Sequence, residues 1–345
     1  MYLSSPLKQA MNRFLFSVIT LLFFSIQTFA QDTVAQKYAG YITADDARKH
    51  LTIIASDAFE GRETGKPGAK KAADYIAAEF AKLGLIAPVA GSYFQNVPLK
   101  DPALKAVNVM GYLEGTDLKN EVLIFSAHYD HIGLNATGVD RINNGADDDG
   151  SGTTAILEIA RAYTQAKKEG KGPRRSILFL TLVGEEKGLL GSEWYSEHPI
   201  FPLKNTIADL NIDMIGRVDP AHAKEPNYCY LIGSDKLSTE LHEISEQANT
   251  IYTQMDIDYK YNDPDDPERI YYRSDHYNFA KHNIPIIFYF NGVHEDYHKP
   301  SDEVSKIQFD LLVKRAQLVF YTGWDLANRD KRPVVDVVND MPARR

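Results

Sequence analysis

The order of apolar and polar positions predicts a chain in which β-strands and helices alternate. Short apolar runs, rich in β-branched and aromatic residues, are typical of buried strands at 107–113, 121–127, 176–183, 207–214, 228–232 and 284–290. Helical spacing of apolar residues falls between several of them, at 152–166, 187–197, 237–248 and 309–327. Strands that alternate with helices favour a parallel sheet covered on both faces. We therefore predict an α/β fold, a three-layer α/β/α sandwich with a mixed, mostly parallel central sheet.

Two more helices are predicted before the first strand. Thr43 is placed to cap a helix that begins at Ala44, and a second apolar stripe runs over 68–83. The residues 59–65 between them have a loop composition. No linker divides the remaining chain, so residues 31–345 are expected to form one domain, with the polar tail after about residue 329 at its periphery as an edge strand or a partly disordered segment.

The first thirty residues are expected to lie outside this domain. Lys8 and Arg13 precede an apolar run at 14–26, which ends in small residues at Ala30. This is the pattern of a secretory signal peptide, and the run is shorter than the ~20 residues of a typical membrane span. We expect cleavage after Ala30 and export to a bacterial periplasm or the extracellular space, with no membrane attachment afterwards. An uncleaved membrane anchor is the alternative.

Composition and charge narrow the classes of function. Hydrophobic residues make up 44% of the chain and charged residues 25%, as in ordinary globular proteins. The net charge of −9 becomes two units more negative without the first thirty residues, so a nucleic-acid partner is not expected. Cys229 is the only cysteine, which excludes an internal disulfide, and its apolar surroundings predict a buried strand residue rather than a nucleophile.

The first candidate for chemistry follows the strand at 121–127. In an extended segment His128 and Asp130 point to the same face, which suits an imidazole metal ligand oriented by a carboxylate behind it. An isolated histidine is more often structural. His131 is expected to be a surface residue.

Adjacent carboxylates mark two further loops. Asp147, Asp148 and Asp149 lie between glycines at the start of a predicted helix, and a helix N-cap accounts for only one of them. Divalent metal ions would account for the rest, because carboxylates can bridge two ions. After the next strand, Glu185 and Glu186 can diverge, one binding metal and the other acting as a general base. Glutamates that merely favour a helix N-terminus are an equally open interpretation.

Two more clusters follow predicted strands. Asp213 lies at the tip of the strand at 207–214, and His298 follows Tyr297 after the strand at 284–290. Each is a weak signal alone. Because parallel strands end at a common edge of a sheet, however, all five clusters are expected to meet there.

In this combination and order, the motifs resemble the secreted di-zinc aminopeptidases, a family related to glutamate carboxypeptidase and to the non-enzymatic transferrin receptor. The resemblance starts at the Gly61–Gly65 loop and extends to Asp302, and the short stretch between Phe94 and Asn108 leaves no room for the extra domain that some members insert. It implies that Asp148 bridges two metal ions and that a non-proline cis peptide follows it. The Ser274 stretch is also similar to the family, either as a helix cap or as a substrate contact.

The same resemblance implies the individual roles. His128 and Glu186 would bind opposite metals, and Asp213 and His298 would complete the set, with their pairing left open. Glu185 would be the general base, Tyr297 would steady the oxyanion, and Asp130 would orient His128.

The function implied is an exopeptidase, most simply an aminopeptidase that acts on peptides with free N-termini. It would use two zinc ions roughly 3.5–4 Å apart, with cobalt or manganese as alternatives. A carboxypeptidase or dipeptidase stays open. So do a glutaminyl cyclase-like enzyme with one zinc and a catalytically inactive, receptor-like binding protein.

Overall fold

The computed structural model describes residues 31–341, and the predicted signal peptide lies outside the described residues. Its sheet has eight strands in the order β1-β2-β4-β3-β5-β8-β6-β7. The strands are β1 (Phe94–Val97), β2 (Ala106–Leu113), β3 (Leu118–His128), β4 (Arg175–Leu182), β5 (Thr206–Ile212), β6 (Tyr228–Ile232), β7 (Asp256–Asp258) and β8 (Ile286–Phe290).

The four central strands, β4, β3, β5 and β8, are mutually parallel. Antiparallel pairing occurs towards the two sides of the sheet, between β1 and β2, β2 and β4, and β6 and β8, while β7 pairs parallel to β6. The predicted mixed, mostly parallel sheet is therefore confirmed. Parallel strands deliver their carboxyl ends to one edge, and this arrangement positions the site.

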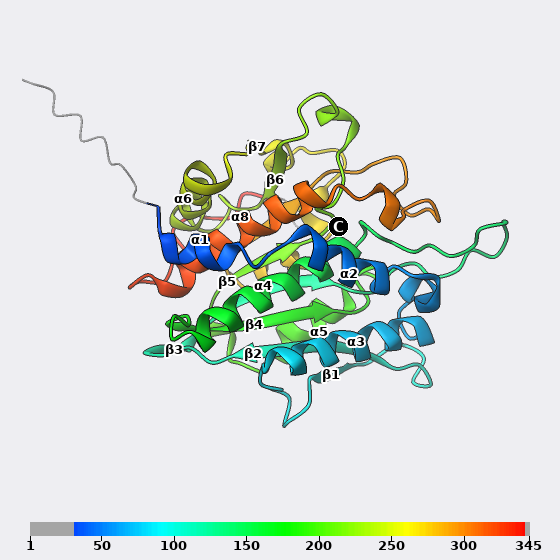
Figure 1. Ribbon diagram of the computed structural model, residues 1–345, viewed down its shortest axis with the longest axis horizontal. Helices are drawn as coiled ribbons and strands as arrows, with labels where there is room; N and C mark the ends of the chain where they lie inside the picture. The colour runs from blue at the N-terminus through cyan, green and yellow to red at the C-terminus, as the bar shows by residue number, and fades with distance from the viewer. Residues whose placement is uncertain (1–30, 342–345) are drawn as a thin grey trace, which may run out of the picture. The chain divides into compact units, whose positions relative to one another are not determined.

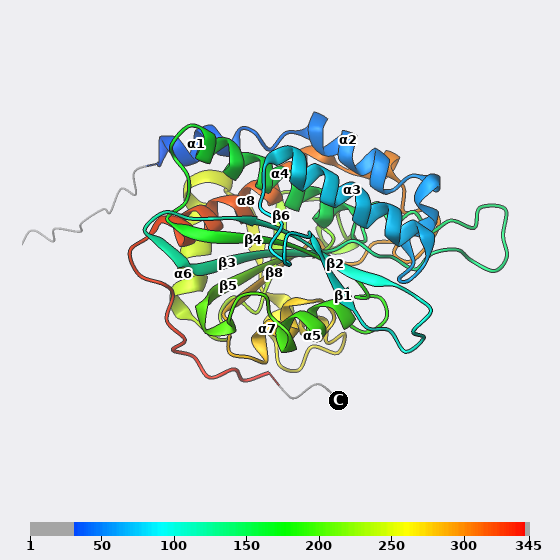
Figure 2. The ribbon, with the colours of Figure 1, turned by 90° about the horizontal axis from the view of Figure 1, so that it is seen from below.

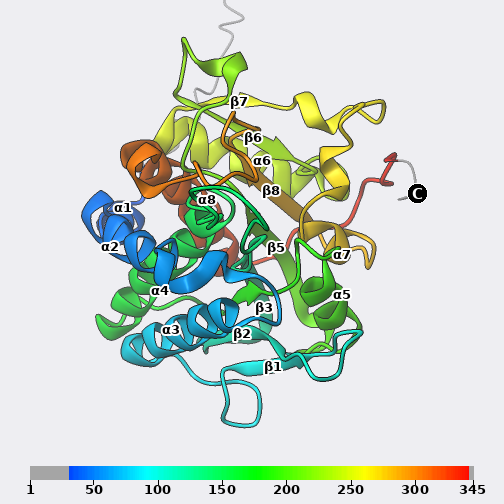
Figure 3. The same cartoon turned by 90° about the vertical axis from the view of Figure 1, so that its right-hand side faces the viewer.

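Helices cover both faces of the sheet. They are α1 (Thr33–Ala39), α2 (Ala44–Ile54), α3 (Pro67–Leu83), α4 (Gly150–Lys168), α5 (Leu190–Glu197), α6 (Thr239–Ala248), α7 (His276–Ala280) and α8 (Phe309–Asn328). Figure 1 shows α4 and α8 running across the sheet. Figures 2 and 3 show α1 to α4 and α8 on one side of the sheet, with α5 and α7 on the other.

The side chains along each strand point alternately to the two faces of the sheet, which explains the three layers. In β4, Ile177 and Phe179 belong to the apolar core beneath α4 and α8, whereas Leu178 and Leu180 belong to the core on the other face. Successive strand side chains point to opposite faces, so a strand that is apolar throughout requires helices on both sides. Cys229 is buried in β6, as predicted, and burial raises its pKa to about 11, which makes it a poor nucleophile.

The predicted helix boundaries agree closely with the structure where a capping residue, a proline or a glycine marks the end of the helix. The Thr43 hydroxyl accepts a hydrogen bond from the Asp46 N–H at 3.3 Å and so caps α2. Pro67 begins α3, and Gly84 ends it in the left-handed conformation that favours glycine. The tail at 329–341 forms neither a helix nor a strand, and its Asp336 N–H donates to the Leu237 carbonyl.

Candidate metal centre

The predicted ligands lie at the common edge where the parallel strands end. His128 is the last residue of β3, Asp213 follows β5, and Glu186 lies in the turn after β4. Asp148 lies just before α4, and His298 lies in the loop after β8. The structure thus brings all five predicted ligand residues into one site from five separate segments.

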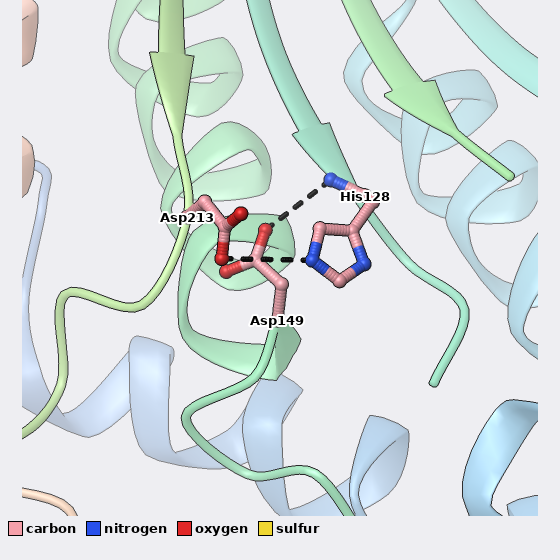
Figure 4. A group of neighbouring side chains, drawn as sticks. All are labelled: His128, Asp149 and Asp213. Atoms are coloured by element: carbon pink, nitrogen blue, oxygen red, sulfur yellow. Dashed lines mark hydrogen bonds and ion pairs between the residues drawn. The ribbon is translucent and has the colours of Figure 1, made fainter. Parts of the chain in front are cut away.

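A first cluster forms around the His128 ring. The Nε2 atom of His128 lies 3.3 Å from Oδ1 of Asp148 and 3.5 Å from Oδ1 of Asp213. All three side chains are buried, and Asp213 is slightly more exposed than His128 and Asp148. Figure 4 shows the carboxylate of Asp213 facing this ring nitrogen.

A second cluster forms on the other oxygen of Asp148. The Nε2 atom of His298 lies 3.1 Å from Oδ2 of Asp148 and 3.2 Å from Oε2 of Glu186. Asp148 therefore presents one oxygen to each cluster, in the position required of a bridging ligand. The pairing that the sequence left open follows from these distances, because Asp213 lies with His128 and His298 lies with Glu186. That these residues bind metal stays a prediction.

The chemistry of these atoms fits a divalent cation. Nε2 of His128, Oδ2 of Asp148 and Oε1 of Glu186 are all buried, yet none makes a hydrogen bond. Buried polar atoms without partners are costly, and a shared cation would satisfy imidazole and carboxylate together. Burial opposes ionisation of Asp148, but the imidazoles of His128 and His298 beside it lower its pKa well below the usual value. The mixed nitrogen and oxygen set suits zinc.

Asp149 lies between His128 and Asp213 but has a different role (Figure 4). Its Oδ2 accepts the backbone N–H of His128 at 3.2 Å, and its Oδ1 accepts those of Gly152 and Met214 at 2.9 and 3.0 Å. Both oxygens are thus engaged by backbone donors. Asp149 ties together the end of β3, the start of α4 and the segment after β5. The cis peptide expected between Asp148 and Asp149 is present.

Asp130 contacts His128 chiefly through its backbone. The Nδ1 atom of His128 lies 3.1 Å from the Asp130 carbonyl oxygen and 3.7 Å from its carboxylate. The carboxylate instead accepts the Thr64 hydroxyl at 2.5 Å and the Glu185 N–H at 3.3 Å. A donor at Nδ1 leaves Nε2 of His128 free to act as a ligand.

Glu185 and Glu186 point in different directions. Gly184 adopts a φ of +77°, which favours glycine, and its carbonyl accepts the Leu190 N–H at 2.9 Å to close the turn. Glu186 faces the second cluster, whereas Oε2 of Glu185 lies 3.9 Å from Nε2 of His128. Burial raises the pKa of Glu185 well above its ordinary value, although the nearby His128 opposes this. A carboxyl of raised pKa can exchange a proton with a reactant.

A small pocket opens onto the centre beside Tyr297. The Tyr297 hydroxyl accepts a hydrogen bond from Arg273 at 3.2 Å, and its ring stacks on His298 at 3.8 Å between centroids. Burial raises the pKa of Tyr297 well above its usual value, so the phenol keeps its proton. The pocket is also lined by Asp148, Glu185 and Asp213 and by the apolar side chains of Met214, Ile270, Phe288, Phe290 and Val293.

One expectation from the sequence is wrong, and one of two open alternatives is not supported. His131 is fully buried against Glu186 rather than exposed, because its backbone N–H donates to the Arg62 carbonyl and draws the residue under the preceding loop. Ser274, left open as a helix cap or a substrate contact, is not the N-cap of α7, a position that Asp275 occupies. The Ser274 hydroxyl accepts a hydrogen bond from the side-chain amide of Asn211 at 2.8 Å.

Arg62 is a structural residue of the site whose role was not identified from the sequence. Its buried guanidinium donates to the carbonyls of Tyr129, Asn144 and Gly145 at 2.7, 2.6 and 2.8 Å, and also to that of Ile54. These carbonyls flank the segments that carry His128 and Asp148. A lone arginine between glycine and acidic residues was the available signal, but its partners are distant in sequence.

Asp302 provides a similar anchor from the opposite side. Its carboxylate accepts the backbone N–H of Asp147 at 3.0 Å and that of Asp148 at 3.2 Å. It therefore fixes the chain that presents the shared Asp148. A carboxylate that accepts backbone donors near a ligand is typical of supporting residues in metal sites.

A three-layer sandwich whose parallel strands bring two histidines and several carboxylates to one edge is the arrangement expected of an α/β metallohydrolase. The model of peptidase family M28 matches residues 108–323, which is more than half of the chain. The protein therefore belongs to peptidase family M28.

The relatives are distant and mostly longer than the matched segment. A probable leucine aminopeptidase from Arthroderma otae is 28% identical over 252 residues, covering 71% of this chain and 63% of that protein. A probable zinc metalloprotease from Pyrenophora teres is 30% identical over 159 residues, which is 31% of its length.

Solved structures share the fold. A zinc aminopeptidase from Bacillus subtilis superposes with a TM-score of 0.65 at 18% identity, covering 87% of this chain and 99% of that one. A Bacteroides thetaiotaomicron glutaminyl cyclase gives a TM-score of 0.62 at 19% identity, covering 82% and 98%. Within residues 31–341, no helix combines the length and apolar character needed to cross a membrane.

Proposed function

We propose that this protein is a zinc-dependent aminopeptidase that uses two metal ions. The observation that carries the proposal is the shared Asp148, whose two oxygens face two separate sets of buried donor atoms. The names of its relatives, which include leucine aminopeptidases and a zinc aminopeptidase, support the same activity.

The residues that would hold the metals follow from the two clusters. His128, Asp213 and one oxygen of Asp148 would hold one ion, and Glu186, His298 and the other oxygen of Asp148 would hold its neighbour. When bound, the pair would polarise the scissile carbonyl and activate water at neutral pH.

The proton steps fall to Glu185. Its carboxylate lies at the first cluster and lines the pocket, and among the described residues it accepts no hydrogen bond. It would take a proton from the attacking water and deliver it to the leaving amine. The hydroxyl of Tyr297, held by Arg273, would donate to the oxygen on which negative charge develops.

The pocket suggests which end of the peptide is read. The apolar residues in its lining suit an uncharged apolar side chain. The lining also includes the carboxylates of Glu185 and Asp213, which suit a free α-ammonium group, and the guanidinium of Arg273, which the Tyr297 hydroxyl contacts. We therefore propose peptides with apolar N-terminal residues and unblocked N-termini as substrates. We also propose that the chain is exported, on the strength of its N-terminal pattern.

Release of amino acids from matched peptides tests the proposal. A leucine-initiated peptide should be cleaved when its N-terminus is free, including when its C-terminus is amidated, and should resist cleavage when N-acetylated. Dialysis against a chelator should abolish the activity, and zinc should restore it. Cleavage of the acetylated peptide from its C-terminus would show a carboxypeptidase instead.

The glutaminyl cyclase alternative is tested by stoichiometry. Two separate donor sets favour two metal ions, whereas the cyclase interpretation requires one. A single equivalent of zinc in metal-replete protein, together with cyclisation of an N-terminal glutamine, would replace our proposal.

A further inference from the structure

The buried imidazole of His131 is not explained by the five predicted ligands. Its Nδ1 lies 2.9 Å from Oε1 of Glu186 and 3.7 Å from Oδ2 of Asp148. Despite the short distance, neither Nδ1 of His131 nor Oε1 of Glu186 makes a hydrogen bond of acceptable geometry, and both atoms are fully buried. The two atoms therefore converge on a common point rather than on each other.

The spacing of the donor atoms fits side chains that share one ion. Ligands about 2.0–2.2 Å from a tetrahedral zinc lie about 3.3–3.6 Å from one another. In the second cluster, Nε2 of His298 lies 3.1 and 3.2 Å from the oxygens of Asp148 and Glu186, and Nδ1 of His131 lies 2.9 and 3.7 Å from oxygens of the same two residues. His131, Asp148 and Glu186 form one group of donor atoms lying within 4.8 Å of one another, a group that does not include His298.

The surrounding chain holds the His131 ring in this position. Its backbone N–H donates to the Arg62 carbonyl at 3.1 Å. A Cβ atom on Gly145 would lie 2.6 Å from the ring, so glycine is required where the imidazole passes. The ring meets that of His298 edge to face, at 5.7 Å between centroids. Two imidazoles thus approach the second cluster from different sides.

We propose that His131 is a further metal ligand. It completes the second cluster with a fourth protein donor, so this position binds its ion more tightly and fills before the first cluster, which has one imidazole and faces the pocket. Four protein donors are typical of closed, stable zinc sites, while an open position is typical of reactive ones. This inference rests on the proposed function, since it assumes that both clusters bind metal.

Cobalt titration of the metal-free full chain provides the test. In Co²⁺-loaded protein, each coordinated imidazole gives its own hyperfine-shifted proton resonances, which histidine labelling identifies. The first equivalent should shift the resonances of His131 and His298, and the second should shift those of His128. Competition with a chromophoric chelator measures the two affinities separately.

Variants separate a ligand from a residue that only orients Glu186. His131→Asn keeps a hydrogen-bond donor near the Nδ1 position but ligates weakly, and His131→Ala removes both. If His131 is a ligand, both variants should lose one set of shifted resonances, and both should bind the tighter ion more weakly than the wild-type chain. As the control, His294→Asn changes a buried histidine that contacts Asp147 at 3.1 Å and belongs to neither cluster. It should leave the order of filling unchanged.

The outcomes also separate this inference from the proposed function. Two bound ions with only two shifted imidazoles, or an affinity restored by His131→Asn, would overturn the role of His131 and leave the aminopeptidase proposal intact. Failure of the wild-type chain to bind cobalt or zinc would overturn both.

Discussion

Replacing Glu185 by glutamine would test the division of work between two adjacent carboxylates. The change keeps the size of the side chain and removes its ability to take a proton. Glu185 is 3.9 Å from the His128 ring and faces the pocket, so it is close enough to act on a water there without belonging to either cluster. General acid–base assistance is typically worth about 10²–10⁴ in rate. We therefore expect kcat to fall by this factor, a barrier increase of about 3–5 kcal/mol.

Glu186→Gln is the matched control because it makes the same chemical change one residue away. Oε2 of Glu186 lies 3.2 Å from His298, so its loss should weaken the second cluster directly. Elemental analysis after dialysis should find two zinc equivalents in Glu185→Gln and fewer in Glu186→Gln. Initial rates on a leucine-initiated peptide give kcat and KM for both variants.

Either of two results would contradict the roles assigned to Glu185 and Glu186. Near-normal kcat in Glu185→Gln would remove this residue as the base. Loss of zinc from Glu185→Gln, with zinc retained in Glu186→Gln, would mean that the two roles are exchanged.

Four other predictions concern single positions. Asp148→Asn should lose most of both metal ions in elemental analysis, because its oxygens face both clusters; retention of two would exclude bridging. Tyr297→Phe should lower kcat by about 10²-fold with little change in KM, since its hydroxyl would act on the developing charge; equal kcat would exclude this role. Burial raises the pKa of Glu158 from 4.5 to about 7, so the folded protein binds this proton more tightly than the unfolded chain does. The free energy of unfolding should therefore fall as the pH rises from 4.5 to 7. Glu158→Gln should abolish that loss, about 2–3 kcal/mol, in denaturant unfolding at pH 4.5 and 8; an unchanged pH profile would contradict the raised pKa. N-terminal sequencing of the exported protein should begin at Gln31, and a start at Met1 would contradict cleavage.

The central strands could be predicted from the sequence, because a strand that is buried on both faces of the sheet has a continuous run of apolar residues. The strand at 228–232 was predicted with the boundaries of β6, since the apolar segment has polar residues at either side. Short elements near the sides of the sheet were not predicted. In β7 only Ile257 is apolar, and β1 includes polar Gln95 and Asn96, so neither shows a strand pattern.

For the site, strand-end carboxylates indicated the ligands, but their geometry required the fold. Which oxygen of Asp148 faces His128 and which faces His298 depends on how the loops return, and no local pattern records this. His131 was misjudged for the same reason. The loop that buries it carries Arg62, roughly seventy positions earlier in the chain, and the contact is through backbone atoms.

The guanidinium of Arg62 has a consequence for anyone who shortens this protein. The family match begins at residue 108, so a fragment cut to those borders would omit Arg62 and Thr64 while keeping every proposed ligand. Such a fragment would leave the carbonyls of Asn144 and Gly145 without the donor that now joins them to Tyr129. The matched segment therefore lacks part of what supports the site, and a shortened chain that keeps the Arg62 contacts, including the one to the Ile54 carbonyl, should start upstream of α2.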